Sequence, residues 1–207
     1  MLRKFILSDV LRGSWKGLIS QIWLLAGLLI GYVIISFALT VFIPAPAQGT
    51  ISLTGMAIML VSLVFSLLFS LGYTQNMFQT LDGEEPQFSA YGLQASKGLT
   101  FLVAYLIYTI IVTVGVALLV VPGIYLAVRL QFFVASIVEE DTGITASLKR
   151  SWEITKGQMK PLLLLLLVSI GFTVLGLAFF VIGIFFISPF IGLMYCYVFR
   201  KLTAFSA

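Results

Sequence analysis

The sequence predicts an all-α fold, a polytopic membrane bundle of six transmembrane helices in three hairpins, with amphipathic helices lying in the membrane interface. The first observation is composition, because 60% of the 207 residues are hydrophobic and 10% are charged, which is far from the values of soluble domains. The second is that apolar runs of about 20 residues, the length that crosses roughly 30 Å of hydrocarbon, recur along the chain. The polar segments between them are too short for a separate aqueous domain, so we expect one membrane domain over residues 1–207.

The apolar runs set the expected order of elements. A basic amphipathic segment is expected at residues 1–16, a cytoplasmic link at 79–97, a second amphipathic helix at 139–160 and a tail at 200–207. Three hairpins are expected between them, at residues 17–78, 98–138 and 161–199. The six spans are residues 17–43, 51–78, 98–121, 122–138, 161–180 and 181–199.

The first hairpin begins with a long apolar run, Gly17–Ile43. A signal sequence has an apolar region of only roughly 7 to 15 residues, so we expect a retained helix. The short, uncharged segment Pro44–Thr50 then leads to the second span. Gly27 and Gly31 form a stripe of small residues, which lets helices approach closely in lipid. We expect that stripe to pack within the bundle, and a dimer interface is the alternative.

The other two hairpins are delimited by turn residues. The turn-like segment Asp82–Pro86 leads into the second hairpin, whose own turn is expected at Val121–Gly123. The third hairpin is expected to start at Pro161 and to turn within the uncharged segment Gly176–Gly183. All these assignments rest on proline and glycine, which interrupt apolar runs.

The distribution of basic residues predicts the orientation of the chain. Eleven of the twelve lysine and arginine residues fall in segments on one side of the expected spans. By the positive-inside rule that side is cytoplasmic, so both termini are expected in the cytoplasm. The eleven residues are Arg3, Lys4, Arg12, Lys16, Lys97, Lys149, Arg150, Lys156, Lys160, Arg200 and Lys201.

The segment from Ile144 to Lys160 has the pattern of an amphipathic helix. On a helical wheel Ile144, Leu148, Trp152 and Met159 fall within about 80° of one another. We expect this helix to lie in the interface, with Trp152 at headgroup depth. The opposite face carries the charges and is expected to contact anionic lipid, through Lys149, Arg150 and Lys156.

A short internal similarity accompanies this helix. Leu11–Lys16 reads LRGSWK and Leu148–Glu153 reads LKRSWE. One interpretation is three related units, each a surface helix followed by a hairpin. Chance similarity between short segments is the other.

Arg129 is the basic residue that falls inside an expected span. An uncompensated cation there costs at least about 2.5 to 3.5 kcal/mol on insertion scales, so a partner is expected. No acidic residue occurs inside any expected span, which leaves backbone carbonyls, amide or tyrosine side chains, a lipid phosphate or a carboxylate of another chain. A structural role, lipid or anion binding and a contact with a partner protein are therefore the three interpretations.

The acidic run Glu139, Glu140 and Asp141 is the candidate for metal binding, because hard cations bind carboxylate oxygens. Adjacent residues of a helix face different directions, so the run by itself cannot surround an ion. We therefore expect a solvated rim that supports the start of the next helix. No metal and no cofactor is expected.

The stretch Pro122–Gly157 resembles a group of poorly characterised prokaryotic membrane proteins. It includes PGIYLAVR, then the three acidic residues, then ASLKRSWEITKG. The group comprises the YciC-like inner-membrane proteins and the membrane domain fused to some glycerophosphodiester phosphodiesterases. The resemblance implies a bacterial cytoplasmic membrane and six helices. It implies no catalytic residue, because the phosphodiesterase activity belongs to a separate domain.

The residue types argue against catalysis. The chain has no histidine, which excludes the Ser-His-Asp triad and most zinc sites, and its one cysteine, Cys196, permits no internal disulfide. Nucleic acid is not an expected partner, because the basic residues lie beside apolar runs. We expect a non-catalytic protein that binds membrane lipids, anionic ones in particular, or another membrane protein or itself, as an accessory or assembly subunit. The alternative is a transporter or channel for small solutes, with a site near Arg129.

Overall fold

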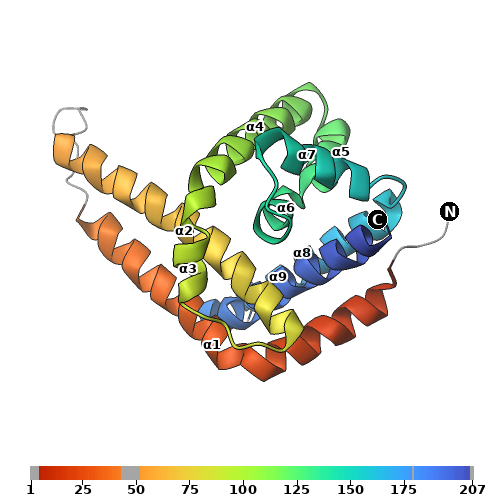
Figure 1. Cartoon of the computed structure of the whole chain (residues 1–207), viewed down its shortest axis with the longest axis horizontal. Coiled ribbons are helices and arrows are strands. Elements are labelled where there is room, and N and C mark those ends of the chain that lie inside the picture. The colour runs from red at the N-terminus through yellow and green to blue at the C-terminus, as the bar shows by residue number, and fades with distance from the viewer. Residues whose placement is uncertain (1–4, 43–51, 179, 206–207) are drawn as a thin grey trace.

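The computed structural model describes residues 5–42, 52–178 and 180–205 (Figure 1). Every regular element in these ranges is helical, which confirms the predicted all-α class. The predicted connector Pro44–Thr50 and the basic residues Arg3 and Lys4 lie outside the described residues. The helices are α1 Leu7–Val41, α2 Leu53–Asp82, α3 Ser89–Leu93, the short 3-10 helix η1 Ala95–Lys97, α4 Gly98–Leu118, α5 Val120–Leu130, α6 Phe133–Glu139, α7 Ile144–Ile154, α8 Met159–Ala178 and α9 Phe180–Ala204.

Six helical segments are long and apolar enough to cross a membrane, as the sequence predicts. One of them joins α3, η1 and α4, and another joins α5 and α6. Six helical segments of this length and hydropathy are compatible with a multi-pass membrane protein. The six segments are Leu7–Val41, Leu53–Asp82, Ser89–Leu118, Val120–Glu139, Met159–Ala178 and Gly183–Ala204.

Helix α1 differs from its prediction. The sequence separates a surface segment at residues 1–16 from a span at 17–43, but residues Leu7 to Val41 form one helix with non-helical dihedral angles at Gln21 (φ −134°, ψ 20°). The first half stays helical because it has a neighbour along its length: Val10 and Leu18 are buried, and α1 packs against α9. Figure 1 shows the bend and the first half of α1 running beside α9.

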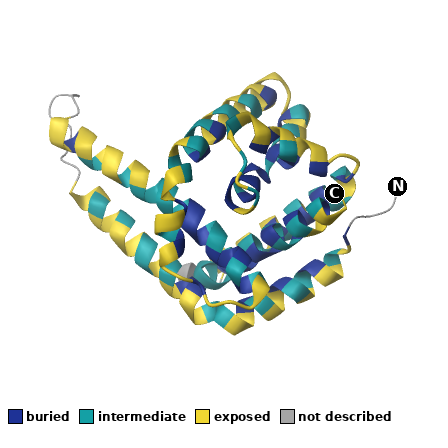
Figure 2. Ribbon diagram, in the orientation of Figure 1, coloured by how far each residue is buried: buried dark blue, intermediate teal, exposed yellow. Residues whose placement is uncertain are grey.

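The second half of α1 and the first half of α2 extend away from the other helices as an arm (Figure 1). Aromatic rings join the two helices there: Tyr32 of α1 stacks on Phe69 of α2 at 4.1 Å between centroids, and Phe69 also stacks on Tyr73 of its own helix at 5.1 Å. The Tyr32 hydroxyl lies 3.2 Å from the Ser66 hydroxyl. Most of the arm surface is exposed (Figure 2), so lipid would cover it in a membrane.

The turn between α4 and α5 lies at Leu119, earlier than the predicted Val121–Gly123. Leu119 is extended (φ −158°, ψ 137°), and Pro122 belongs to the first turn of α5. Proline is tolerated there because the first backbone amides of a helix have no intrahelical acceptor. Gly123 instead allows close packing: a Cβ atom at Gly123 would lie 2.6 Å from the backbone nitrogen of Val116.

Helices α8 and α9 also pack closely through glycines, since a Cβ atom on Gly183 would lie 2.5 Å from the carbonyl oxygen of Gly176.

The buried core lies where α2, α6 and α9 meet. Phe78, Phe132 and Phe199 are fully buried there, and the Phe199 ring contacts the rings of the other two. Figure 2 shows this buried centre between exposed outer surfaces.

Candidate functional site

The candidate site forms where the α5–α6 segment breaks and α7 packs against it. Residues Gln131 and Phe132 interrupt the helix, which leaves backbone groups without helical partners. Side chains of α7 bind them: the hydroxyls of Ser151 and Thr155 donate to the Arg129 carbonyl oxygen at 2.9 and 3.1 Å, and the Phe132 amide donates to the Ser151 hydroxyl at 3.1 Å. These bonds hold Arg129 next to α7.

The Arg129 side chain lies between two aromatic rings. Its guanidinium carbon is 4.2 Å from the centroid of the Trp152 ring and 5.9 Å from that of Tyr125, and the two rings meet edge to face at 5.9 Å. Arg129 is only 4% exposed. Its Nε is buried without a hydrogen-bond partner, and Arg129 takes part in no ion pair among the described residues. The cation is therefore stacked on aromatic rings and not neutralised.

The face that α7 buries is rotated from the predicted one. The buried residues are Ser147, Leu148, Ser151 and Ile154, whereas the wheel placed Trp152 on the apolar face and left Ser147 and Ser151 out of it. Small hydroxyl side chains turn inward because they hydrogen-bond to backbone groups. Trp152 lies at the edge of the contact and is partly exposed, which lets it cover Arg129.

The other three predicted lipid contacts do not join Arg129. Lys149 is exposed and lies 3.9 Å from Glu153 of the same helix, and Lys156 is exposed beyond the end of α7. Arg150 binds Glu140 through three hydrogen bonds of 2.8 to 3.1 Å. That bonding with the carboxylate raises the pKa of Arg150 above its usual value. Arg150 is thus an internal contact of the protein.

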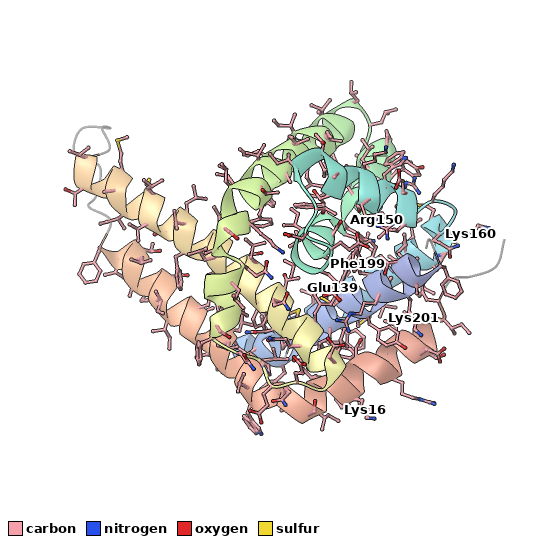
Figure 3. The ribbon with its side chains drawn as sticks, in the orientation of Figure 1. Lys16, Glu139, Arg150, Lys160, Phe199 and Lys201 are labelled. Carbon is pink, nitrogen blue, oxygen red and sulfur yellow. The ribbon has the colours of Figure 1, made fainter. Side chains whose placement is uncertain are left out.

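The three consecutive acidic residues pair with bases on three different elements. Glu139 binds Arg200 of α9, Glu140 binds Arg150 of α7, and Asp141 binds Lys97 of η1 at 2.9 Å. Glu139 is exposed and Glu140 partly buried, so the expected rim lies partly at the surface, but its carboxylates are paired, because adjacent residues that face different directions each meet a different neighbouring base. Figure 3 shows Glu139 and Arg150 in the region where α6, α7 and α9 converge.

Two further contacts extend this acidic cluster, defined as Glu139, Glu140 and Asp141. Arg200 also binds both carboxylate oxygens of Asp82 at the end of α2. Lys97 donates to the carbonyl oxygens of Ile137 and Val138 at 3.1 and 3.2 Å, at the negative end of α6. Within the described residues no group of three metal-binding side chains is found.

Sequence reasoning missed Arg200 and Asp82 as partners because they lie 118 residues apart. The sequence indicated this pair only weakly, because it shows no more than that both residues are charged and lie at the ends of apolar runs. Tyr125 and Tyr105 were the tyrosines that the sequence offered as partners of Arg129. Tyr125 lies four residues before Arg129 on one helix face, and its ring centroid is 5.9 Å from the guanidinium carbon.

Two apolar clefts lie elsewhere, and Arg129 lines neither. One, of about 540 Å³, lies along the arm between α1, α2 and α3 and includes Gly27 and Gly31. No atom lies within 4 Å of a Cβ atom built on either glycine, so the expected packing of this stripe within the bundle is not seen among the described residues. The other, of about 940 Å³, lies between α1, α8 and α9.

The model of one protein family, the domain of unknown function DUF7847, matches residues 86–207, more than half of the chain. The chain belongs to the DUF7847 family. The match begins before α3 and runs through α9, so in this DUF7847 protein it includes Arg129, Trp152 and the acidic cluster, while α1 and α2 lie outside it. No curated protein and no solved structure matches the chain.

Proposed function

We propose that this DUF7847 protein is a non-catalytic integral membrane protein of a bacterial cytoplasmic membrane, and that it binds anionic lipid or a membrane-protein partner as an accessory or assembly subunit. In this proposal its spans form three hairpins, both termini are cytoplasmic, and α7 lies at the inner leaflet. The resemblance of Pro122–Gly157 to YciC-like proteins supports the choice of membrane, and the basic segments support the orientation.

The observation that carries the proposal is the buried, unpaired cation of Arg129. Cation–π contacts contribute roughly 0.5 to 2 kcal/mol, whereas a cation within the bilayer costs at least about 2.5 to 3.5 kcal/mol. The Tyr125 ring lies at 5.9 Å, the limit of such a contact, so Trp152 at 4.2 Å supplies most of the stabilisation and part of the cost remains. An anion at the guanidinium edge would supply the remainder.

The surroundings favour a lipid phosphate as that anion. Trp152 and Tyr125 are 38% and 40% exposed, and aromatic rings of this kind prefer the boundary between headgroups and acyl chains. Lys149 lies three residues before Trp152 on α7, and Lys156 follows the end of that helix. Both lysines are exposed and would attract an anionic membrane surface.

Small-solute transport is the second candidate, and the break between α5 and α6 is the observation that favours it. Transporters use interrupted helices to bind solutes near the middle of the membrane. This candidate requires a polar cavity that reaches Arg129, whereas the two clefts described above are lined almost entirely by apolar side chains.

Native mass spectrometry of the protein purified in mild detergent tests the proposal. The wild type should retain anionic phospholipid or a partner protein, Arg129→Leu should lose it, and Arg129→Lys should keep part of it because the charge remains. Lys160→Gln, which removes an exposed cation away from the site, is the control. Protection of the buried Cys196 thiol from a labelling reagent shows that each variant is folded. Equal retention by Arg129→Leu and the control would overturn the proposal.

A further inference from the structure

A second candidate for lipid binding shares no lining residue with the Arg129 site and is the cleft of about 940 Å³ between α1, α8 and α9. Its volume falls at the upper end of the roughly 300 to 1,000 Å³ typical of small-molecule sites. Its walls are apolar and aromatic, and the first half of α1 closes one side. The lining includes Ser8, Arg12 and Trp15 of α1, Phe172 and Leu175 of α8, and Phe190 of α9.

The polar groups of this lining are confined to one end. Ser8 and Arg12 lie one helical turn apart near the start of α1, and the remaining lining residues have apolar or aromatic bodies. A cleft that is polar at one end and apolar along its length matches an amphiphile with one headgroup. A soluble metabolite would leave most of its polar groups without partners there.

The positive charge of Arg12 at the polar end of the cleft can bind an anion. Arg12 is exposed and takes part in no ion pair among the described residues. Lys16, one turn further along α1, is also exposed and projects from the outer side of the helix (Figure 3). A guanidinium binds a phosphate through two parallel hydrogen bonds. The cationic choline of a zwitterionic lipid would be repelled by Arg12 and Lys16, so the cleft favours a headgroup with a net negative charge.

Aromatic rings define the region between headgroup and acyl chains. Trp15 lies one turn beyond Arg12, is partly exposed and meets Phe190 edge to face at 5.8 Å; Phe190 in turn meets Phe172 at 5.1 Å. Tryptophan prefers the boundary below the headgroups, and the phenylalanines would contact the chains.

We propose that this cleft binds one anionic phospholipid, with its phosphate on Arg12 and its acyl chains along α8 and α9. The site shares no residue with the Arg129 site, so each can fail without the other. Because the occupant lies between α1 and the α8–α9 pair, it would join a segment outside the family match to segments inside it.

Native mass spectrometry of delipidated protein titrated with phosphatidylglycerol or phosphatidylcholine tests this site. The wild type should bind one phosphatidylglycerol in preference to phosphatidylcholine. Arg12→Gln should weaken phosphatidylglycerol binding about fivefold, the effect of one basic side chain beside an anionic lipid, and Lys160→Gln should have a smaller effect. Leu175→Trp fills the cleft and should abolish binding, whereas Leu177→Trp, an exposed residue of α8 outside the lining, should not.

Arg129→Leu should leave this titration unchanged, which separates the two sites. Equal effects of Arg12→Gln and Lys160→Gln, or of the two tryptophan variants, would overturn the proposal. Conversion of a dimer to a monomer by Leu175→Trp would also overturn it, because a second copy of the chain would then occupy the cleft.

Discussion

The ion pair between Glu140 and Arg150 should contribute measurably to stability, because it is bidentate and largely shielded from water. Its side chains are 25% and 27% exposed, and its hydrogen bonds are 2.8 to 3.1 Å long. Hydrogen bonds to charged groups contribute about 1.5 to 3 kcal/mol when well shielded. Because both side chains keep some contact with water, which screens their attraction, we expect a smaller coupling free energy of about 1 to 2 kcal/mol.

A double-mutant cycle with Glu140→Gln and Arg150→Met measures this coupling. The stability losses of the two single variants should add up to more than the loss of the double variant, and the difference is the coupling free energy. For a chain of this size 1 kcal/mol corresponds to a shift of about 2 to 4 °C in the unfolding midpoint. The chain carries its own probe, because Cys196 is its one cysteine and is buried. The midpoint is read from labelling of this thiol by a fluorescent reagent during heating.

Lys149 and Glu153 provide the matched control on the same helix. They lie 3.9 Å apart and are 78% and 53% exposed, so the cycle with Lys149→Met and Glu153→Gln should give a coupling of less than about 0.5 kcal/mol. Equal coupling in the two cycles would refute the argument that burial and geometry make the Glu140–Arg150 pair strong.

Two further substitutions test the packing that positions the site, both by the same thermal assay. Gly123→Ala should destabilise the protein by about 1 to 3 kcal/mol, because its Cβ atom would overlap the Val116 backbone; Gly171→Ala, with no atom within 4 Å, should be neutral or slightly stabilising. Ser151→Ala should cost about 1 to 3 kcal/mol, since it removes the acceptor of a buried amide and a donor to the Arg129 carbonyl, and no loss of stability would contradict that role.

The apolar runs predicted the class and the number of membrane-length helices because crossing hydrocarbon imposes one length on every span. The same signal could not place the start of α1, since its first half is stabilised by contact with α9 and not by its own composition. The turn at Leu119 was missed for a related reason: Pro122 suits the first turn of a helix as well as a loop.

The sequence singled out Arg129 and Trp152, and the structure brings them into contact. It could not indicate which face of α7 is buried, because the hydroxyls of Ser151 and Thr155 read as polar until the broken backbone beside them is known. The pairing of the acidic cluster was equally hidden, because charge complementarity between distant segments depends on how the helices cross.

The membrane orientation underlies both lipid proposals, and cysteine accessibility in intact cells tests it most directly. In a Cys196→Ala background, Thr145→Cys on α7 and Phe205→Cys near the C-terminus should react with an impermeant thiol reagent only after permeabilisation, because both lie on the basic side of the chain. Gln48→Cys, in the uncharged connector, should react in intact cells. Labelling of Thr145→Cys and Phe205→Cys in intact cells, with protection of Gln48→Cys, would contradict the orientation and with it the assignment of α7 to the inner leaflet.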